Sequence, residues 1–414
     1  MRDYGRTAKK ITAVLFLVQS LSSAGFIAVF TVNALAGVDL SGRQALAGLP
    51  QAINQMGQAL AALTWGYTME RIGRRRGLAM GQVVGVVGSA IAGVAVIVRS
   101  FPLFLAGLAL MGMARASADL GRFAAAEVHL TAKRGRAIST VVLGGTVGAV
   151  VGPLLAGVTG KWSLGAGLPE LAGPYSVGFV FWAMAGILVF AGLRPDPRDV
   201  AREMARLDPQ GASYRGITRT LPEIVRLPGV IVAIVTVVFA QMVMVMLMVM
   251  TSVHMKVQHH SLSAVSFVIS AHTFGMYAFG VISGRLTDRW GRGPVIIVGS
   301  GVLILSCLMA APSVDLLPLA GALFLLGLGW NFAYVAGSTL LADQLSATER
   351  SKTQGFNDLL LGFASAAGSF CSGTIFAVGG YAALSLVAAS AGLVPLGLAI
   401  WWQVSGRSTP SANV

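Results

Sequence analysis

A charged nonapeptide occurs twice in the chain. It reads Gly66-Tyr-Thr-Met-Glu70-Arg71-Ile-Gly73-Arg74 and, 218 residues later, Gly284-Arg-Leu-Thr-Asp288-Arg289-Trp-Gly291-Arg292. Two further charges repeat at almost the same displacement, since Glu127 stands seven residues before Arg134 and Asp343 seven residues before Arg350. Charged motifs that recur at a common displacement indicate that the chain consists of two homologous halves.

The segments between these motifs are apolar. Of the 414 residues, 55% are hydrophobic and only 11% are charged, whereas a soluble domain carries about 25% charged residues. This composition argues strongly against a soluble enzyme. The apolar runs are about 20 residues long, which is the length needed to cross a hydrocarbon core of about 30 Å. We count twelve such runs, centred near residues 22, 56, 87, 113, 147, 184, 240, 274, 303, 328, 365 and 392.

We therefore expect an all-α membrane protein with twelve transmembrane helices in two pseudo-symmetric halves of six. A charged, proline-rich stretch separates the halves and contains an amphipathic segment from Asp199 to Leu207. The expected organisation is a first half at 1–193, a cytoplasmic linker at 194–228 and a second half at 229–414. Parallel repeats of this kind, related by an axis along the membrane normal, are typical of alternating-access transporters.

The basic residues report orientation. On the expected topology, 24 of the 30 lysines and arginines lie on one side of the membrane and four on the other. The positive-inside rule then places both termini in the cytoplasm. The formal net charge of +14 is explained in this way, and we expect the lipid bilayer rather than a nucleic acid as the partner. Cys307 and Cys371 both fall inside apolar runs, so no disulfide framework is expected.

The duplicated charges predict a gate at the cytoplasmic ends of the helices. The carboxylates and arginines can bind one another and the exposed helix termini, and such a cluster would hold this face shut in one state. The alternative is a set of solvated charges that only fix topology, and the duplicated spacing favours the gate. Its candidate residues are Gly66, Glu70, Arg71, Gly73, Arg74 and Glu127, with Asp288, Arg289, Arg292 and Asp343 in the second half.

Charged residues also occur inside a span. Arg115, Asp119 and Arg122 share one face of the fourth helix because they are four and three residues apart. Each charge would cost roughly 2.5–3.5 kcal/mol at the centre of a bilayer, so these side chains should pair and face a cavity. We expect Arg115 and Asp119, with Asn331 of the tenth span, to line that cavity. A substrate or proton-coupling site and a purely structural ion pair both remain open.

Methionine and histidine form the second polar feature of the spans. The seventh span reads Gln241-Met-Val-Met-Val-Met-Leu-Met-Val-Met250, and the eighth contains His272-Thr-Phe-Gly-Met276. Residues four apart share a helix face, so Met244 and Met248 form one stripe and Met242, Met246 and Met250 another. Thioether sulfur is a soft ligand that suits Cu(I), and imidazole also binds copper. The alternative is that methionine merely fills gaps between helices.

The candidate copper ligands are Met244, Met248, His272 and Met276. Two other frames of the seventh span, Met242 with Met246 and Met246 with Met250, remain open. At the outer mouth, where a metal would first arrive, stand His254, Met255, His259 and His260. Copper would be the transported substrate, and no cofactor is expected.

These motifs resemble those of the major facilitator superfamily, and the resemblance covers the whole chain. The superfamily's loop after the second helix reads Gly-x-x-x-Asp-Arg-x-Gly-Arg-Arg, from which this chain departs only at Glu70. The methionine and histidine motifs resemble those of the CcoA-type copper importers, a bacterial branch. Two further segments look typical of that branch, namely Gly327-Leu-Gly-Trp-Asn-Phe332 and Gln354-Gly-Phe-Asn-Asp358.

The resemblance implies copper import across the bacterial inner membrane, with delivery toward assembly of cytochrome oxidase. It matches best when Met244 and Met248 are paired with His272 and Met276. The same branch is also similar to riboflavin transporters. The alternative is therefore an organic-solute carrier, for riboflavin uptake or for proton-coupled export of a drug or metabolite.

Overall fold

The computed structural model describes residues 2–130, 133–207 and 219–405. Residues 208–218 of the predicted linker and residues 406–414 lie outside this part of the chain. The described residues form helices and connecting loops, with no strand among them. They divide into two compact units: Met1–Arg43, Leu49–Tyr214 and Ser261–Ser266 form the first, and Gln44–Gly48, Arg215–His260 and Phe267–Val414 form the second. The boundaries predicted for the linker remain a prediction.

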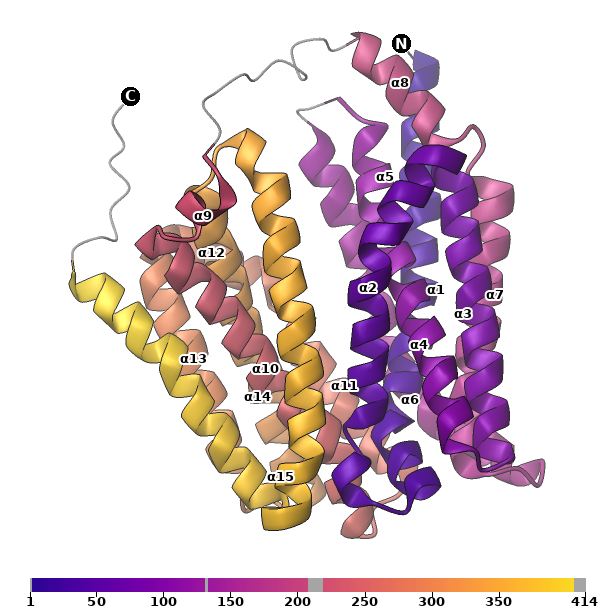
Figure 1. The fold of residues 1–414 in the computed structure, drawn as a ribbon, viewed down its shortest axis with the longest axis vertical. Helices are drawn as coiled ribbons and strands as arrows, with labels where there is room; N and C mark the ends of the chain where they lie inside the picture. Colours follow the sequence, from indigo (N-terminus) through magenta and orange to yellow (C-terminus); the bar gives the residue numbers. More distant parts are fainter. Residues whose placement is uncertain (1, 131–132, 208–218, 406–414) are drawn as a thin grey trace. The chain divides into compact units, whose positions relative to one another are not determined.

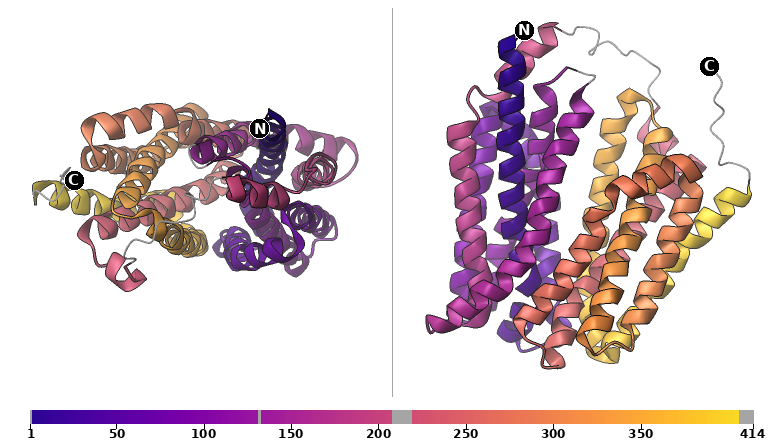
Figure 2. Two further views of the ribbon diagram at one scale, coloured as in Figure 1. Left: turned by 90° about the horizontal axis from the view of Figure 1, so that it is seen from above. Right: turned by 180° about the vertical axis from the view of Figure 1, so that it is seen from behind.

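The first unit is a bundle of long helices (Figure 1). Its elements are α1 (Arg2–Ser41), α2 (Leu49–Ile72), α3 (Arg74–Ile97), α4 (Phe101–Asp119), α5 (Gly121–Glu127), α6 (Arg134–Gly165), η3 (Glu170–Ala172), α7 (Gly173–Gly192) and α8 (Pro197–Leu207). Helix α1 packs along α6 and α7, while α4 packs against α2 and α3. Figure 2 shows α1 running beside α6.

The second unit repeats this arrangement. Its elements are η1 (Gln44–Leu46), α9 (Leu221–Ile224), α10 (Pro228–Val257), α11 (Leu262–Ala278, whose first residues belong to the first unit), α12 (Gly280–Trp290), α13 (Arg292–Ala310), α14 (Leu316–Asp343) and α15 (Ala347–Val404). Helix α10 packs most extensively against α15, as α1 does against α6, and α13 packs against α14, as α3 does against α4. The contacts therefore follow the duplication seen in the sequence.

The helices account for the twelve predicted crossings. Nine helices of the described chain are long and apolar enough to span a membrane, and α11 with α12 forms one more span bent by 42°. Helix α15 has 58 residues, and its backbone leaves the helical region at Gly380 (φ 71°, ψ −170°). At 1.5 Å per residue it would be about 87 Å long, far more than one hydrocarbon core. It therefore supplies two crossings, which meet at a turn (Figure 1).

The remaining crossing is α2, which is long enough at 24 residues but rich in amides. Gln51 and Asn54 are buried in it, and the Asn54 amide donates to the main-chain oxygen of Leu108 at 3.0 Å. These polar side chains lower the hydropathy of α2 while they tie it to α4. The prediction of twelve transmembrane helices in an all-α fold is thus confirmed.

Candidate functional site

The first copy of the charged motif forms an ion pair between helix ends. Arg74, the first residue of α3, donates from Nε and Nη2 to the two oxygens of Glu127 at 3.0 and 2.5 Å. Gly73 precedes it with φ 97°, a conformation that an L side chain rarely adopts. This glycine turns the chain between α2 and α3, and the turn directs Arg74 toward the end of α5.

Asp196 is a further residue of this cluster that sequence reasoning missed. Its two carboxylate oxygens accept hydrogen bonds from the backbone N–H groups of Arg74 and Arg75, each at 3.1 Å. A carboxylate at the first turn of a helix satisfies orphan donors and complements the helix dipole. Arg198 completes the join by donating to the main-chain oxygens of Glu70 and Arg71, which end α2.

The second copy of the motif repeats the ion pair within the second unit. Arg292, the first residue of α13, donates from Nε to Asp343 at 2.7 Å, and Gly291 precedes it with φ 90°. The structure therefore joins Arg74 with Glu127 and Arg292 with Asp343 in equivalent places.

The other predicted gate residues lie around these pairs. The side chains of Glu70, Asp288 and Arg289 are exposed, and Arg71 bonds the hydroxyl of Tyr67 on its own helix. No described atom lies close to the space beside Gly66 or Gly284. The role of the whole set as a gate remains a prediction.

A polar cluster surrounds Asp119 in the first unit. Arg115 Nε lies 3.2 Å from one carboxylate oxygen, and that oxygen also accepts from the Gln19 amide at 3.3 Å. The other oxygen accepts from the Gln58 amide at 3.0 Å. Arg115 further donates to Ser23 at 2.9 Å. Asp119 is thus bound by side chains of α1, α2 and α4.

Sequence reasoning found only part of this cluster. The spacing of Arg115 and Asp119 on one helix predicted their contact, and Gln58 belongs to a visible set of amides in α2. Gln19 is followed by Ser20, Ser22 and Ser23 in α1, and nothing in this local pattern relates it to α4. Asn331, in the second unit, donates from its amide to the main-chain oxygen of Met276 at 2.6 Å, and its place in the predicted cavity remains a prediction.

His272 and Met276 face α14 at a close helix crossing. The His272 side chain is fully buried, and its Nδ1 donates to the main-chain oxygen of Leu323 at 2.9 Å. Its Nε2 has no hydrogen-bonding partner among the described residues. A Cβ on Gly327 would lie 2.2 Å from the His272 main-chain oxygen and 2.8 Å from the Met276 nitrogen. Glycine at 327 therefore allows α14 to touch the α11 backbone between the two candidate ligands.

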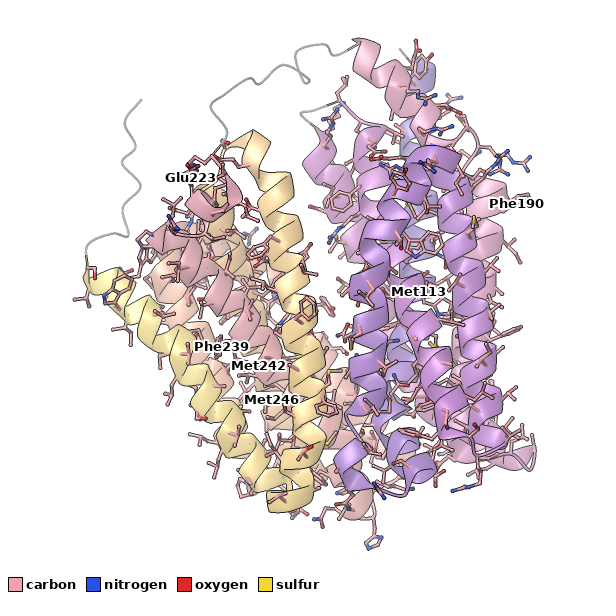
Figure 3. The ribbon with its side chains drawn as sticks, viewed as in Figure 1. Met113, Phe190, Glu223, Phe239, Met242 and Met246 are labelled. Atoms are coloured by element: carbon pink, nitrogen blue, oxygen red, sulfur yellow. The ribbon has the colours of Figure 1, made fainter. Side chains whose placement is uncertain are left out.

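The two methionine stripes of α10 have different surroundings. Met242 and Met246 lie against α15, because a Cβ on Gly368 would contact both side chains at 3.1 and 3.3 Å (Figure 3). Met244 and Met248 point to the opposite side of the helix and are buried. Met242 and Met246 thus pack between helices α10 and α15, whereas the frame that binds metal remains a prediction.

Contacts between α10 and α14 indicate how far along the bundle axis Met244 and Met248 lie. The Trp330 indole donates to Gln241 at 2.9 Å, and Gly337 lies against Val237, so α10 and α14 run antiparallel. Toward the start of α14 and the end of α10, the Trp330–Gln241 contact pairs Leu323 with Met248 and Gly327 with Met244. The contact of Gly337 with Val237 shifts this register by three residues, about 4.5 Å, and pairs Leu323 with Thr251 and Gly327 with Leu247. Met248 and Met244 therefore lie within about one helical turn of the depths of His272 and Met276.

The outer histidines are engaged in other contacts. His254 Nε2 lies 2.9 Å from the main-chain oxygen of Ser313, and its ring stacks on Tyr381 with centroids 4.3 Å apart. His260 Nε2 lies 2.9 Å from the oxygen of Val314. Met255 is buried and His259 is exposed. In the part of the chain that the structure describes, no three His, Cys, Asp or Glu side chains gather as a metal site. Capture of metal by these four residues remains a prediction.

An ion pair that the sequence did not reveal holds the end of the linker. Arg219 donates from Nε and Nη2 to the two oxygens of Glu349, at 2.9 and 2.8 Å. These hydrogen bonds hold the pKa of the Glu349 carboxyl well below its usual range. Glu349 also accepts from the backbone N–H of Ser346, which caps the start of α15.

Two helical units with matching contacts, twelve crossings and repeated ion pairs define a membrane transporter of two pseudo-symmetric halves. The model of the Major Facilitator Superfamily matches residues 15–257 and 232–413, so the chain belongs to this family and is a secondary transporter. An uncharacterized MFS-type transporter of Bacillus subtilis (strain 168), YdeG, is 36% identical over 95% of this chain and 92% of its own length. A second one from that strain, YddS, is 35% identical over 95% of this chain and 91% of its own length.

A relative with a stated substrate is the riboflavin transporter RfnT of Brucella anthropi. It is 28% identical over 90% of this chain and 91% of its own length. Among solved structures, a D-xylose-proton symporter superposes with a TM-score of 0.75 at 15% identity, covering 97% of this chain and 98% of the other. That likeness shows the fold alone.

Proposed function

We propose that this transporter imports copper across the bacterial cytoplasmic membrane, with both termini in the cytoplasm, and supplies it for cytochrome oxidase assembly. The observation that carries the proposal is the His272 imidazole. Its Nδ1 is fixed by Leu323, so the neutral ring presents the Nε2 lone pair, which lacks a partner among the described residues. A metal-binding histidine commonly donates its other nitrogen to a carbonyl in this way.

The methionines would supply soft ligands at similar depths. Met276 stands one turn from His272 on α11, and Met248 and Met244 stand within about one turn of these depths on α10. Sulfur and imidazole would replace the hydration of Cu(I) while each single bond stays weak enough for release. The organisation of the family implies that the two halves expose this site to each side in turn. The resemblance to CcoA-type importers supports the inward direction.

The pairs Arg74–Glu127 and Arg292–Asp343 would contribute to the cytoplasmic gate. Each joins the start of one helix to the end of another within its own unit, so its rupture frees a helix end. Asp119 would sense protons, because protonation removes the charge that Arg115 and the two amides bind. Copper import would be coupled to protons if protonation of Asp119 changed the state of the gate pairs.

The second candidate is a carrier of a flat organic solute such as riboflavin. The observation that favours it is a set of aromatic rings on α11 and α14. Trp330 stacks on Tyr334 with centroids 4.6 Å apart, and it meets the Tyr277 ring edge-on at 6.4 Å. Such rings suit a planar ligand, and the relative RfnT is named for riboflavin. In this reading the methionines would line the pathway without binding metal.

The test is uptake of radioactive copper by cells that lack endogenous high-affinity import. Intact protein, His272→Ala/Met276→Ala and empty vector are compared, with riboflavin uptake measured in parallel. Met242→Leu/Met246→Leu serves as the matched control, because leucine keeps the volume against Gly368. We expect copper uptake by the intact protein and by the control only. Equal copper in every strain, with riboflavin uptake by the intact protein, would instead establish the second candidate.

A further inference from the structure

Two arginines lie over one exposed aromatic ring at the end of α7. The Phe190 side chain is 61% exposed and stands at the edge of the first unit (Figure 3). The guanidinium of Arg75, from α3, lies 4.7 Å from the ring centroid, and that of Arg194 lies 5.8 Å from it. A cation over an aromatic face is attracted by the electron density of the ring. Phe190 therefore orients two positive charges on one patch.

Neither charge is neutralised by a carboxylate in the described chain. Arg75 donates from Nε and Nη2 to the main-chain oxygen of Phe190, at 3.0 and 2.6 Å. Asp196, the acidic neighbour, directs its oxygens to the backbone N–H groups of Arg74 and Arg75 instead. Among the described residues no ion pair involves the side chain of Arg75 or Arg194. The patch keeps a net positive charge that an anion can share.

An apolar surface continues from this patch along two neighbouring helices. On α7 the exposed side chains Ile187 and Met184 follow Phe190 at spacings of three residues, which keeps them near one face. On α3, which packs beside α7, Met80, Val83 and Val87 are exposed as well. Both helices are candidate membrane spans. A water-soluble anion would bind only the basic patch, whereas an amphiphile can bind both the basic patch and the apolar surface.

We propose that this basic and apolar surface binds an anionic phospholipid from the leaflet that faces the Arg75 end of α3. The phosphate lies between the guanidinium groups of Arg75 and Arg194, whose N–H donors form charge-assisted hydrogen bonds to its oxygens. The acyl chains run along Ile187 and Met184 on one side and Val83 on the other. Each arginine beside a membrane span raises the affinity for an anionic lipid roughly fivefold.

The experiment is native mass spectrometry of the purified protein titrated with phosphatidylglycerol or with phosphatidylcholine. The variants are Arg194→Gln and Arg75→Gln/Arg194→Gln. Arg136→Gln is the matched control, since Arg136 is exposed near the start of α6 and is not one of the two arginines over the Phe190 ring. Arg194→Gln removes no hydrogen bond to Phe190, so it tests the site even if the double variant loosens the end of α7.

We expect the intact protein to retain one phosphatidylglycerol more tightly than phosphatidylcholine. The affinity should fall roughly fivefold in Arg194→Gln and about 25-fold in the double variant, with little change in Arg136→Gln. Equal binding of the two lipids would overturn the proposal, and so would an equal loss in the control. Displacement of the lipid by millimolar inorganic phosphate would show a site for a free anion instead. This test is independent of copper transport.

Discussion

Nδ1 of His272 donates a hydrogen bond to the main-chain oxygen of Leu323, 2.9 Å away on another helix. The carbonyl oxygen can only accept, so this contact fixes the proton of the neutral ring on Nδ1. It also ties the middle of α11 to α14. The ring thus has a structural nitrogen and a second nitrogen with no structural task in the described chain, and the two roles can be separated by substitution.

His272→Asn separates them. The asparagine amide occupies a position near Nδ1 and keeps a donor for Leu323, but it has no atom at the place of Nε2. We expect this variant to keep its expression and thermal stability while copper uptake falls at least tenfold, because even the loss of a hydrogen-bonding partner of a metal ligand commonly costs about 10–100-fold in metal affinity or activity. Radioactive copper uptake and a thermal unfolding scan measure the two effects. Copper uptake at the level of the intact protein would remove His272 from the metal site.

Gly327→Ala tests the close crossing of α11 and α14. Its new Cβ would lie 2.2 Å from the His272 main-chain oxygen, so the helices must separate. Overpacking of this kind costs about 1–3 kcal/mol, and we expect a lower unfolding temperature together with weaker copper uptake. Gly321→Ala is the matched control on the same helix, because no described atom lies within 4 Å of its Cβ. Equal stability of both variants would contradict the crossing.

Arg74→Ala combined with Arg292→Ala removes both repeated ion pairs. We expect this variant to spend more time open at the cytoplasmic face, because two helix ends in equivalent positions lose their partners. Cysteines introduced at that face should then react several-fold faster with a water-soluble maleimide. Arg99→Ala is the control, since its ion pair and hydrogen bond with Asp39 are exposed, and exposed pairs contribute little. Unchanged reactivity in the double variant would leave both pairs without a gating role.

Asp119→Asn tests proton coupling. The amide keeps the size of the carboxylate but cannot change charge, and it leaves Arg115 without its ion-pair partner. If Asp119 senses protons, the pH dependence of copper uptake should flatten in this variant. Uptake is measured in vesicles across a range of external pH, with Gln19→Leu as a variant that removes one donor and keeps the carboxylate. A pH profile identical to that of the intact protein would mark Asp119 as a structural partner of Arg115.

The ion pair of Glu349 and Arg219 predicts a loss of stability in acid. The pKa of Glu349 is lowered by its hydrogen bonds with Arg219, so the folded state favours the ionised carboxylate. Its contribution is complete above the ordinary glutamate pKa of 4.5 and is lost as the pH falls through the lower folded value. Glu349→Gln should therefore show a smaller drop in unfolding temperature between about pH 6 and about pH 3.5. Arg219→Ala should reproduce this flattening, and a drop as large as that of the intact protein would contradict the assignment.

The helical fold was predictable because its causes are local in sequence. Apolar runs of span length, the glycines before Arg74 and Arg292, and the duplicated charges are all visible along the chain. The least visible span is α2, whose amides lower its hydropathy, and the duplicated motif at its end supports the apolar run near residue 56. The turn at Gly380 was predictable in position only as a break between two long apolar runs.

The polar clusters were less predictable because they join residues far apart in the chain. Arg115 and Asp119 are one turn apart, so their contact follows from helix geometry. Asp196 binds backbone N–H groups that carry no sequence signal, and Gln19 reaches Asp119 only after three helices have assembled. The side chain of Glu70 is exposed, and its part in the gate remains a prediction from the motif.

The turn at Gly380 leaves almost no loop between the last two crossings. Tyr381, the next residue, is buried and is hydrogen-bonded to Thr251 at 2.8 Å, so the chain is fastened where it reverses. A peptide tag inserted here would have to break that anchor, whereas most connections at the surface of a membrane protein accept such insertions. The two helical segments of α15 are therefore joined directly, and a displacement of one segment moves the other.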